Sequence, residues 1–251
     1  MDDVRTVHGF HAVERVKTRP VALAGAVRAG RIVHGRLYAG RTDMVITDGT
    51  PLVLGSGSPR RREILTSLGV PIVVVVGSVD ETVRANEDPE TYLRRVVADK
   101  LVAAVAKLAR AEDAPAVLVA DTIVVVDGEI LGKPRDERDA VALLTRIVGR
   151  THRVQTRYAL LVGGSIDGQR VERTVESLVT MRAANADVVA RYAATGEGLD
   201  KAGAYAAQGI GTFLVERIEG SFTNVVGLPA REVVGDLMEL GLLRDFPRAP
   251  E

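Results

Sequence analysis

The segment LVLGSGSPRRREILTSLGVPIVVVV, residues 52–76, indicates the class of fold. Its first three residues are apolar and predict a short buried strand, and residues 59–68 predict a helix that ends before Gly69. Pro59 suits the first position of that helix, because its fixed φ is helical and an N–H there would have no partner within the helix. Residues 72–76 are all β-branched and predict a second strand. A strand, a helix and a strand in succession are typical of an α/β protein.

The same alternation continues towards the C-terminus. The pair Asp127-Gly128 indicates a hairpin, and Asn185 can cap a helix. Further strands are expected at residues 117–126, 154–162, 171–180 and 213–218, and further helices at residues 88–110, 136–148, 185–194 and from Ala230 onward. No linker rich in proline, glycine or serine divides the chain, so we expect one large α/β domain.

Composition excludes several classes of protein. The 251 residues, 46% of them hydrophobic and 26% charged, are ordinary for a globular protein. Lysine and arginine together number 33, as do aspartate and glutamate, so no overall positive field would attract nucleic acid or an anionic membrane. The absence of cysteine excludes disulfides and a cysteine nucleophile. The start MDDVRTVHGFH is unlike a secretory signal, and we expect a cytoplasmic protein.

Residues 1–50 differ from the rest and are interpreted as an N-terminal extension of uncertain structure. They contain three of the four histidines and only short apolar stretches. His8 and His11 are spaced so that one helix face can present both to a metal, although surface histidines on an extension are the simpler explanation. Met44 is an alternative start of the chain.

Arginines gather where the first helix begins, in the motif SGSPRR. The N-terminal end of a helix carries about half a positive charge, so Arg60, Arg61 and Arg62 are unfavourable there unless an anion is present. The preceding loop offers free backbone N–H groups and the hydroxyls of Ser56 and Ser58. Guanidinium groups bind phosphate through paired hydrogen bonds. The motif therefore predicts a phosphate site; a solvated basic helix start and a kinase target are the alternatives.

Two charged residues stand where structure alone would not place them, and a third, Glu81, lies in a loop after a predicted strand. Lys100 lies within the apolar face of the helix at residues 88–110, so we expect it to meet an anion or a carboxylate, unless it reaches past the core to water. Asp121 interrupts an apolar strand, which favours metal binding, orientation of water or pairing with a cation. The alternatives are a structural salt bridge and a capping turn with Thr122. Glu81 can supply a second carboxylate, or it is simply a solvated loop residue.

Further polar groups follow in two loops. Lys133 comes after the hairpin, and Lys201 lies at the start of DKAGAYAAQG, residues 200–209. The glycines and alanines of that segment leave room for a ligand, and Tyr205 and Gln208 can offer it a ring and an amide. Each residue is nonspecific by itself, but together with the motif and carboxylates above they favour one ligand site.

These residues together resemble the Maf family of nucleotide pyrophosphatases. The motifs that carry the resemblance are, in order, LVLGSGSPRRREIL, VDE, ADK, VADTIVVVDGEILGKPRD, GRTHRVQT, GEGLDKAGAYAAQG and NVVGLP. They define a domain over residues 51–243, followed by a tail at residues 244–251. The resemblance implies a two-lobed α/β domain with a central mixed, twisted sheet flanked by helices and a substrate cleft between the lobes. It also implies Mg²⁺ or another divalent cation such as Mn²⁺, and a homodimer.

The resemblance further implies hydrolysis of a nucleoside triphosphate, with dTTP and UTP preferred, to the monophosphate and pyrophosphate. The implied roles are substrate binding for Ser56, Arg60, Arg61, Lys133, Lys201 and Gln208, catalysis for Asp121, Glu81 and Lys100, and metal binding for Glu81 and Asp121. Asp121 would also be the base for the attacking water, and Gln208 would help to read the nucleotide base.

Departures from the family pattern are few. Ala206 and Ala207 stand where a glycine-isoleucine pair is common, Arg62 is a third arginine, and residues 1–50 have no counterpart. None of these removes a group that the reaction needs. The alternatives are a non-catalytic nucleotide-binding regulator of cell division on the same scaffold and a sugar-phosphate or nucleic-acid phosphatase. A P-loop enzyme is disfavoured because G-x-x-x-x-G-K-[ST] is absent.

Overall fold

The computed structural model describes residues 31–33, 36–38, 44–108, 114–163 and 165–247. The chain divides into two units, Met1–Gly40 and Arg41–Glu251. In the first unit, strand β1 (Arg31–Val33) pairs with strand β2 (Arg36–Tyr38) in antiparallel register. His8 and His11 lie outside the described residues, so the metal-binding hypothesis for them stays untested.

The second unit is built on a seven-stranded mixed sheet. Its strands are β3 (Leu52–Leu54), β4 (Ile72–Val74), β5 (Ala116–Val126), β6 (Glu129–Leu131), β7 (Thr151–Val162), β8 (Arg170–Met181) and β9 (Val215–Glu219). They are ordered β4-β3-β5-β7-β8-β9, with β6 paired to β5. Strand β3 is parallel to β4 and β5, and the other pairs are antiparallel. The expected α/β fold with a central mixed sheet is confirmed.

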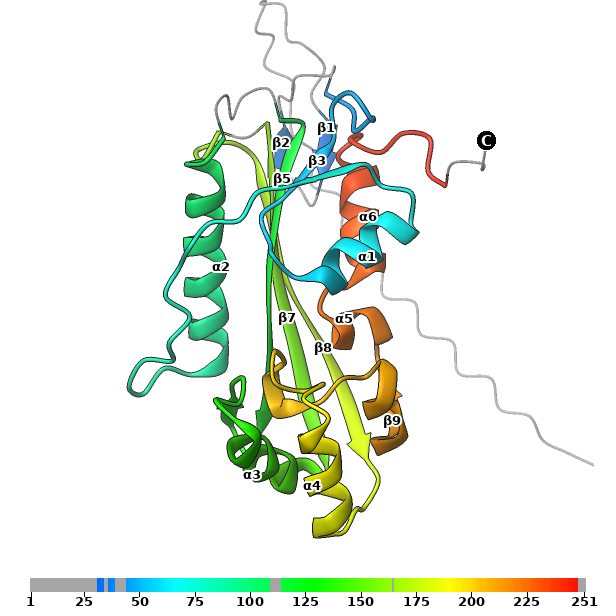
Figure 1. Cartoon of the computed structure of the whole chain (residues 1–251). Helices are drawn as coiled ribbons and strands as arrows, with labels where there is room; N and C mark the ends of the chain where they lie inside the picture. The colour runs from blue at the N-terminus through cyan, green and yellow to red at the C-terminus, as the bar shows by residue number, and fades with distance from the viewer. Residues whose placement is uncertain (1–30, 34–35, 39–43, 109–113, 164, 248–251) are drawn as a thin grey trace, which may run out of the picture. The chain divides into compact units, whose positions relative to one another are not determined.

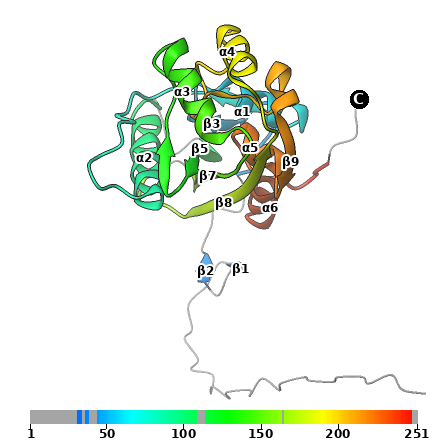
Figure 2. The same cartoon turned by 90° about the horizontal axis from the view of Figure 1, so that it is seen from below.

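Helices cover both faces of this sheet (Figure 1). They are α1 (Pro59–Ser67), α2 (Pro89–Val105), α3 (Glu137–Ile147), α4 (Ala186–Ala194), α5 (Phe222–Val226) and α6 (Ala230–Glu239). Helix α2 lies on one face of the sheet, and α1 and α6 lie on the other, as both views show (Figures 1 and 2). Among the described residues, no helix combines the length and the apolar character needed to cross a membrane.

Strand β5 places its side chains alternately on the two faces of the sheet. The odd-numbered residues of 117–125 face α2, and the even-numbered residues of 118–126 face the helices on the opposite side. On each face, one apolar cluster lies before the middle of the strand and another lies after it. Asp121 and Thr122 fall between these clusters, one on each face.

The middle of β5 has one edge without a neighbouring strand. Along the other edge, β7 pairs with residues 116–125 without interruption. On the open edge, β3 pairs with residues 117–118 and β6 pairs with residues 124–126. No described strand pairs with residues 119–123 there. Side chains from both faces of the sheet can therefore reach the same gap.

Three of the differences between the observed and the expected elements have a clear outline. Strand β9 begins later than residue 213, because Gly209–Leu214 form a 3-10 helix. Helix α5 escapes prediction, because its five residues are too few to show a helical period. Helix α2 ends earlier than expected, at Val105. The predicted cap of α4 is confirmed, since Asn185 Oδ1 accepts a hydrogen bond from the Val188 N–H at 2.9 Å.

The second unit also includes residues before the expected boundary at residue 51. Ile46 is fully buried in the same apolar cluster as Leu52 and Leu242. Its N–H donates to the carbonyl oxygen of Leu242 at 2.8 Å. The N-terminal edge of this unit is therefore tied to the segment that follows α6.

Candidate active site

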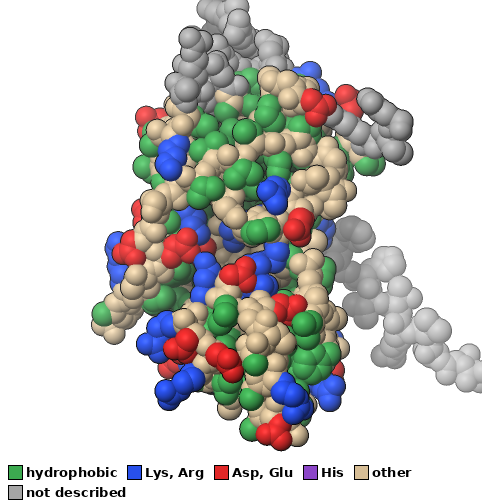
Figure 3. All heavy atoms as spheres, in the orientation of Figure 1, with side chains coloured by type: hydrophobic (Ala, Val, Ile, Leu, Met, Phe, Trp, Pro, Cys, Tyr) green, Lys and Arg blue, Asp and Glu red, His purple; other side chains and the backbone are tan. Residues whose placement is uncertain are grey.

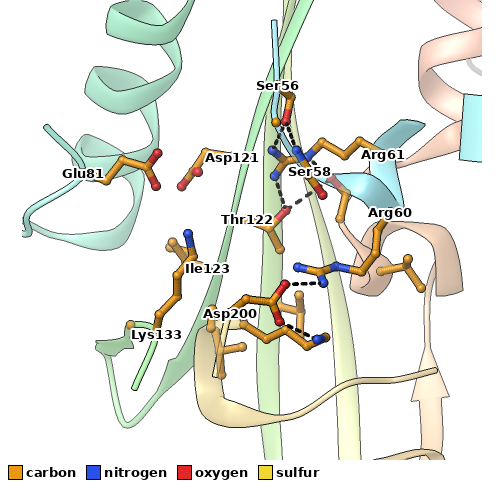
Figure 4. A pocket seen from close by; sticks show the side chains of 18 of the residues that line it. Ser56, Ser58, Arg60, Arg61, Glu81, Asp121, Thr122, Ile123, Lys133 and Asp200 are labelled. Atoms are coloured by element: carbon orange, nitrogen blue, oxygen red, sulfur yellow. Dashed lines mark hydrogen bonds and ion pairs between the residues drawn. The ribbon is translucent and has the colours of Figure 1, made fainter. Parts of the chain in front are cut away.

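A cavity of about 1020 Å³ opens at the unpaired edge of β5. Three loops contribute to its lining: residues 55–58 before α1, residues 76–83 before α2, and residues 197–209 after α4. The residues to which the resemblance gives a role all line this cavity: Ser56, Arg60, Arg61, Glu81, Lys100, Asp121, Lys133, Lys201 and Gln208. Arg62, the third arginine of the motif, is exposed and is not part of the lining. Figure 3 shows acidic and basic side chains gathered across the middle of this face, and Figure 4 shows several of them from close by.

Arg61 is held by three different parts of the fold. Its Nε donates to the carbonyl oxygen of Gly227 at 2.7 Å. Its Nη1 and Nη2 donate to Ser56 Oγ at 3.0 Å and to Thr122 Oγ1 at 3.1 Å (Figure 4). Burial lowers the pKa of Arg61, and an arginine still keeps its charge at neutral pH. Three of its five N–H groups are used in these contacts, which leaves two for an anion.

Arg60 and Lys201 share one carboxylate. Arg60 Nη1 donates to Asp200 Oδ2 at 2.9 Å, and Lys201 Nζ donates to Asp200 Oδ1 at 2.5 Å. Partial burial acts to raise the pKa of Asp200, but the hydrogen bonds from Lys201 and Arg60 outweigh it and lower the pKa to about 2. Asp200 is therefore ionised at neutral pH. It links the start of α1 to the loop that follows α4.

Lys100 contacts both predicted carboxylates. Its Nζ lies 2.6 Å from Asp121 Oδ1 and 3.0 Å from Glu81 Oε1. The Lys100 and Asp121 side chains are 13% and 8% exposed, so the pair is largely removed from water. The expectation that Lys100 meets a carboxylate is confirmed. Strand β5, helix α2 and the loop before α2 thus meet at one ammonium group.

The loop that carries Glu81 is fastened to α2 through its backbone. Tyr92 Oη donates to the carbonyl oxygen of Glu81 at 3.0 Å. Arg95 donates from Nη1 to the carbonyl of Asp80 at 3.1 Å and from Nη2 to that of Thr82 at 2.9 Å. Three successive carbonyls are therefore bound by two side chains of one helix. These contacts hold the Glu81 carboxylate near Lys100.

The two carboxylates fit a small divalent cation. Burial acts to raise the pKa of Glu81, but the Lys100 ammonium and the other nearby cations outweigh it, so the pKa is lowered and the group is ionised at neutral pH. Glu81 and Asp121 already contact one cationic nitrogen, and a metal ion in that place would contact both. No described group of three or more His, Cys, Asp or Glu side chains is placed to hold a metal. A cation here would complete its shell with water and phosphate oxygens, which is the usual habit of Mg²⁺.

Lys133 and Gln208 are exposed and line the cavity. Lys133 follows β6, and its ammonium points towards Asp121 (Figure 4). Gln208 lies in the loop that follows α4. Tyr205 of the same loop is buried, and its hydroxyl lies 2.8 Å from His152 Nε2.

Among the cavity residues that the sequence does not predict as site residues are Thr122, Glu197 and Asp200. Thr122 Oγ1 lies 2.9 Å from Thr156 Oγ1 in addition to accepting from Arg61. The sequence signal for Thr122 was its position directly after Asp121 in an apolar strand. Successive strand residues point to opposite faces of the sheet, so Thr122 is the polar residue on the face opposite Asp121. Glu197 offered a weaker signal, a single acid between two glycines.

The fold and the cavity define the class, an α/β protein in which several cationic side chains line one cavity beside a pair of carboxylates. The family model described as "Maf-like protein" matches residues 51–240. The chain therefore belongs to the Maf-like protein family.

Curated relatives cover nearly all of their own length in this comparison. A dTTP/UTP pyrophosphatase of Myxococcus xanthus is 47% identical over 195 residues, which is 78% of this chain and 95% of that protein. Proteins of the same name from Methylobacillus flagellatus and Neisseria meningitidis are 44% and 40% identical, over 77% and 76% of this chain and 94% of each relative. A solved structure of the Staphylococcus aureus Ham1 protein matches 77% of this chain and 98% of its own, at 14% identity and a TM-score of 0.43.

Proposed function

We propose that this protein hydrolyses nucleoside triphosphates to a nucleoside monophosphate and pyrophosphate. The observation that carries the proposal is the contact of Lys100 with both Asp121 and Glu81, in the cavity that the Ser56–Arg61 pair also lines. Cleavage at the α-phosphorus requires cations for the triphosphate and a proton acceptor for water. Both are present in one cavity, and the relatives named dTTP/UTP pyrophosphatases support the same reaction.

In this proposal the triphosphate binds along the loop before α1. The Ser56 hydroxyl and the two remaining N–H groups of Arg61 bind phosphate oxygens. Arg60, Lys133 and Lys201 supply further positive charge around the chain of phosphates. Arg61 is held rigidly by the protein, so it loses little freedom when it binds an anion. Arg60 must exchange part of its contact with Asp200 for the phosphate.

Asp121 is the proposed base for the attacking water. The water adds to the α-phosphorus, the bond from that phosphorus to the bridging oxygen breaks, and the proton of the water passes to an Asp121 oxygen. The electron pair of the broken bond leaves on pyrophosphate. Lys100 holds Asp121 in place and offers positive charge as negative charge develops on the departing oxygen.

Glu81 and Asp121 are the proposed holders of a divalent cation, Mg²⁺ or Mn²⁺. Such an ion would neutralise phosphate charge and lower the pKa of a coordinated water. Tyr92 binds the backbone of Glu81 itself and Arg95 binds the backbone on either side of it, so this carboxylate stays in place when the cation replaces part of its contact with Lys100.

Gln208 is the proposed reader of the nucleotide base, with uracil and thymine preferred. Uracil and thymine present an acceptor, a donor and an acceptor along the pairing edge, whereas cytosine exchanges the first two. A side-chain amide can satisfy either pattern by turning over, so it discriminates only when its orientation is fixed. The methyl group of thymine is worth about 1 kcal/mol, so both dTTP and UTP should be accepted.

We expect the protein to be a homodimer and to be located in the cytoplasm. Sedimentation of the purified protein measures the oligomeric state directly. A monomer at micromolar concentration would remove the dimer from this proposal and leave the reaction unchanged.

A non-catalytic nucleotide-binding regulator on the same scaffold is the competing function. The two hypotheses are separated by incubating the protein with Mg²⁺ and dTTP, UTP, CTP or GTP and resolving the products by ion-exchange chromatography. The proposal expects monophosphate and pyrophosphate, with kcat/KM for dTTP and UTP above that for CTP and GTP. Tight binding without turnover would support the regulator, and diphosphate with orthophosphate would show cleavage at another bond.

A further inference from the structure

The segment around Gln208 is held by a cluster of hydrogen bonds that the reaction itself does not use. Gln208 is exposed, and its side chain has no hydrogen-bond partner among the described residues. The place of its amide in the cavity therefore depends on the backbone of residues 206–211. That backbone is fixed from one side by two residues, Tyr192 of α4 and Glu197 in the loop that follows it.

Glu197 binds the segment after Gln208. Its Oε1 accepts a hydrogen bond from the N–H of Ile210, and its Oε2 accepts one from the N–H of Gly211, both at 2.7 Å. Charged acceptors make the stronger kind of hydrogen bond to backbone N–H groups. Partial burial acts to raise the pKa of Glu197, but the bonds from Gly211 and Ile210 outweigh it and lower the pKa. The carboxylate is therefore ionised at neutral pH.

Tyr192 binds the segment before Gln208. Its hydroxyl accepts a hydrogen bond from the N–H of Ala206 at 3.0 Å and donates to Glu197 Oε2 at 2.8 Å. The two side chains thus form one connected unit that reaches the backbone on both sides of Gln208. We call this unit, Tyr192 and Glu197, the loop clasp.

The glycines of the segment are what allow the loop clasp to approach so closely. Gly209 has φ of +68°, and a Cβ on it would lie 2.2 Å from Glu197 Oε1. A Cβ on Gly211 would lie 2.5 Å from the Tyr192 hydroxyl oxygen. Side chains at either position would displace the clasp, and at Gly209 they would also strain the backbone. The local sequence is therefore matched to a carboxylate at position 197.

We propose that Glu197, acting with Tyr192, is a positioning residue for base selectivity: it fixes the backbone from which Gln208 projects, and so sets where the Gln208 amide meets the nucleotide base. The inference rests on the proposed role of Gln208. The clasp is separate from the Lys100–Asp121–Glu81 cluster. Its loss should affect discrimination between bases far more than the bond-breaking step.

The test compares Glu197→Gln with wild type and with Glu216→Gln, a matched change of an exposed carboxylate on β9. The glutamine keeps the size of the side chain but turns one oxygen into an NH₂ group that cannot accept from a backbone N–H. We measure kcat and KM for UTP and CTP, inhibition by inorganic tripolyphosphate, and hydrogen exchange of the Ile210 and Gly211 amides. Tripolyphosphate reports on the phosphate side of the cavity alone.

For Glu197→Gln we expect the ratio of kcat/KM for UTP over CTP to fall about tenfold, with most of the loss in the KM for UTP. Exchange of the two amides should accelerate, while tripolyphosphate inhibition and the behaviour of Glu216→Gln should match wild type. If Glu197→Gln does not fold, Tyr192→Phe decides the question, because it keeps the packed ring and should lower the same ratio by a smaller factor.

A variant that keeps the wild-type ratio within twofold, even with a lower Tm, would show that the clasp is only structural. In that case the proposed role of Gln208 would stand, because wild type would still prefer UTP. A wild-type enzyme with no preference between UTP and CTP would overturn both the role of Gln208 and this inference. The two failures are therefore distinguishable.

Discussion

Replacement of Lys100 with methionine tests the electrostatic centre of the site. The change keeps an unbranched apolar side chain and removes the ammonium that lies 2.6 Å from Asp121 and 3.0 Å from Glu81. Removing one partner of a buried ion pair destabilises a protein by about 3–5 kcal/mol, because the other charge stays buried and unpaired. The Glu81 side chain is 41% exposed and can turn towards water, so we expect a somewhat smaller loss, about 2–4 kcal/mol.

Thermal unfolding followed by circular dichroism measures this effect. For a domain of this size, about 2–4 kcal/mol corresponds to a fall in Tm of roughly 5–15 °C. Lys133→Met is the matched control, because Lys133 is exposed, and its Tm should stay close to that of wild type. Adding MgCl₂ should raise the Tm of Lys100→Met more than that of wild type, since the cation can take the place of the ammonium. A Tm of Lys100→Met within about 2 °C of wild type, or an equal response of both proteins to Mg²⁺, would refute this reasoning.

Three further predictions concern other parts of the molecule. Asp121→Asn should lower kcat by about 10²- to 10⁴-fold while nucleotide binding, measured by calorimetry, survives, and a fall below fivefold would remove Asp121 from the role of base. Burial lowers the pKa of His152 to about 4, below its ordinary 6.5, so the unfolded chain binds the extra proton between these values. The free energy of unfolding should therefore reach its full value above about pH 6.5 and should fall by about 2 kcal/mol from pH 7 to pH 5. Urea unfolding measures this pH dependence, which should be weaker in His152→Gln. Deletion of residues 1–43 should leave turnover nearly intact, whereas deletion of residues 1–48 also removes Ile46 from the core and should lower the Tm; equal Tm values for the two truncations would contradict the packing of Ile46.

The fold was predictable where local pattern and tertiary packing agree. Strand β5, helix α3 and helix α4 each combine an apolar pattern with turn or capping residues, and the sequence locates them within a few residues. The sequence predicts a strand from residue 213, whereas residues 213 and 214 end the 3-10 helix Gly209–Leu214, whose apolar residues have no period of their own. Its conformation depends on the contact of two backbone amides with Glu197, which lies far enough away in the sequence to escape a local pattern.

The sequence reveals those site residues whose type is unfavourable for stability at their position. Lys100 on an apolar helix face and Asp121 in an apolar strand both lack a structural reason, and the structure brings them together. Asp200 gives no such signal, because an acid next to a lysine in a loop looks like an ordinary surface pair. Its contact with Arg60 joins residues 140 positions apart, and nothing local in the sequence encodes it.

The central claim is that water attacks the α-phosphorus of a nucleoside triphosphate, and an isotope experiment tests it most directly. The protein is incubated with UTP and Mg²⁺ in water enriched in ¹⁸O, and the products are analysed by mass spectrometry. The account predicts one ¹⁸O atom in UMP and none in pyrophosphate. Label in pyrophosphate would place the attack on the β-phosphorus, and label in orthophosphate with UDP as the other product would place it on the γ-phosphorus; either result would contradict the account.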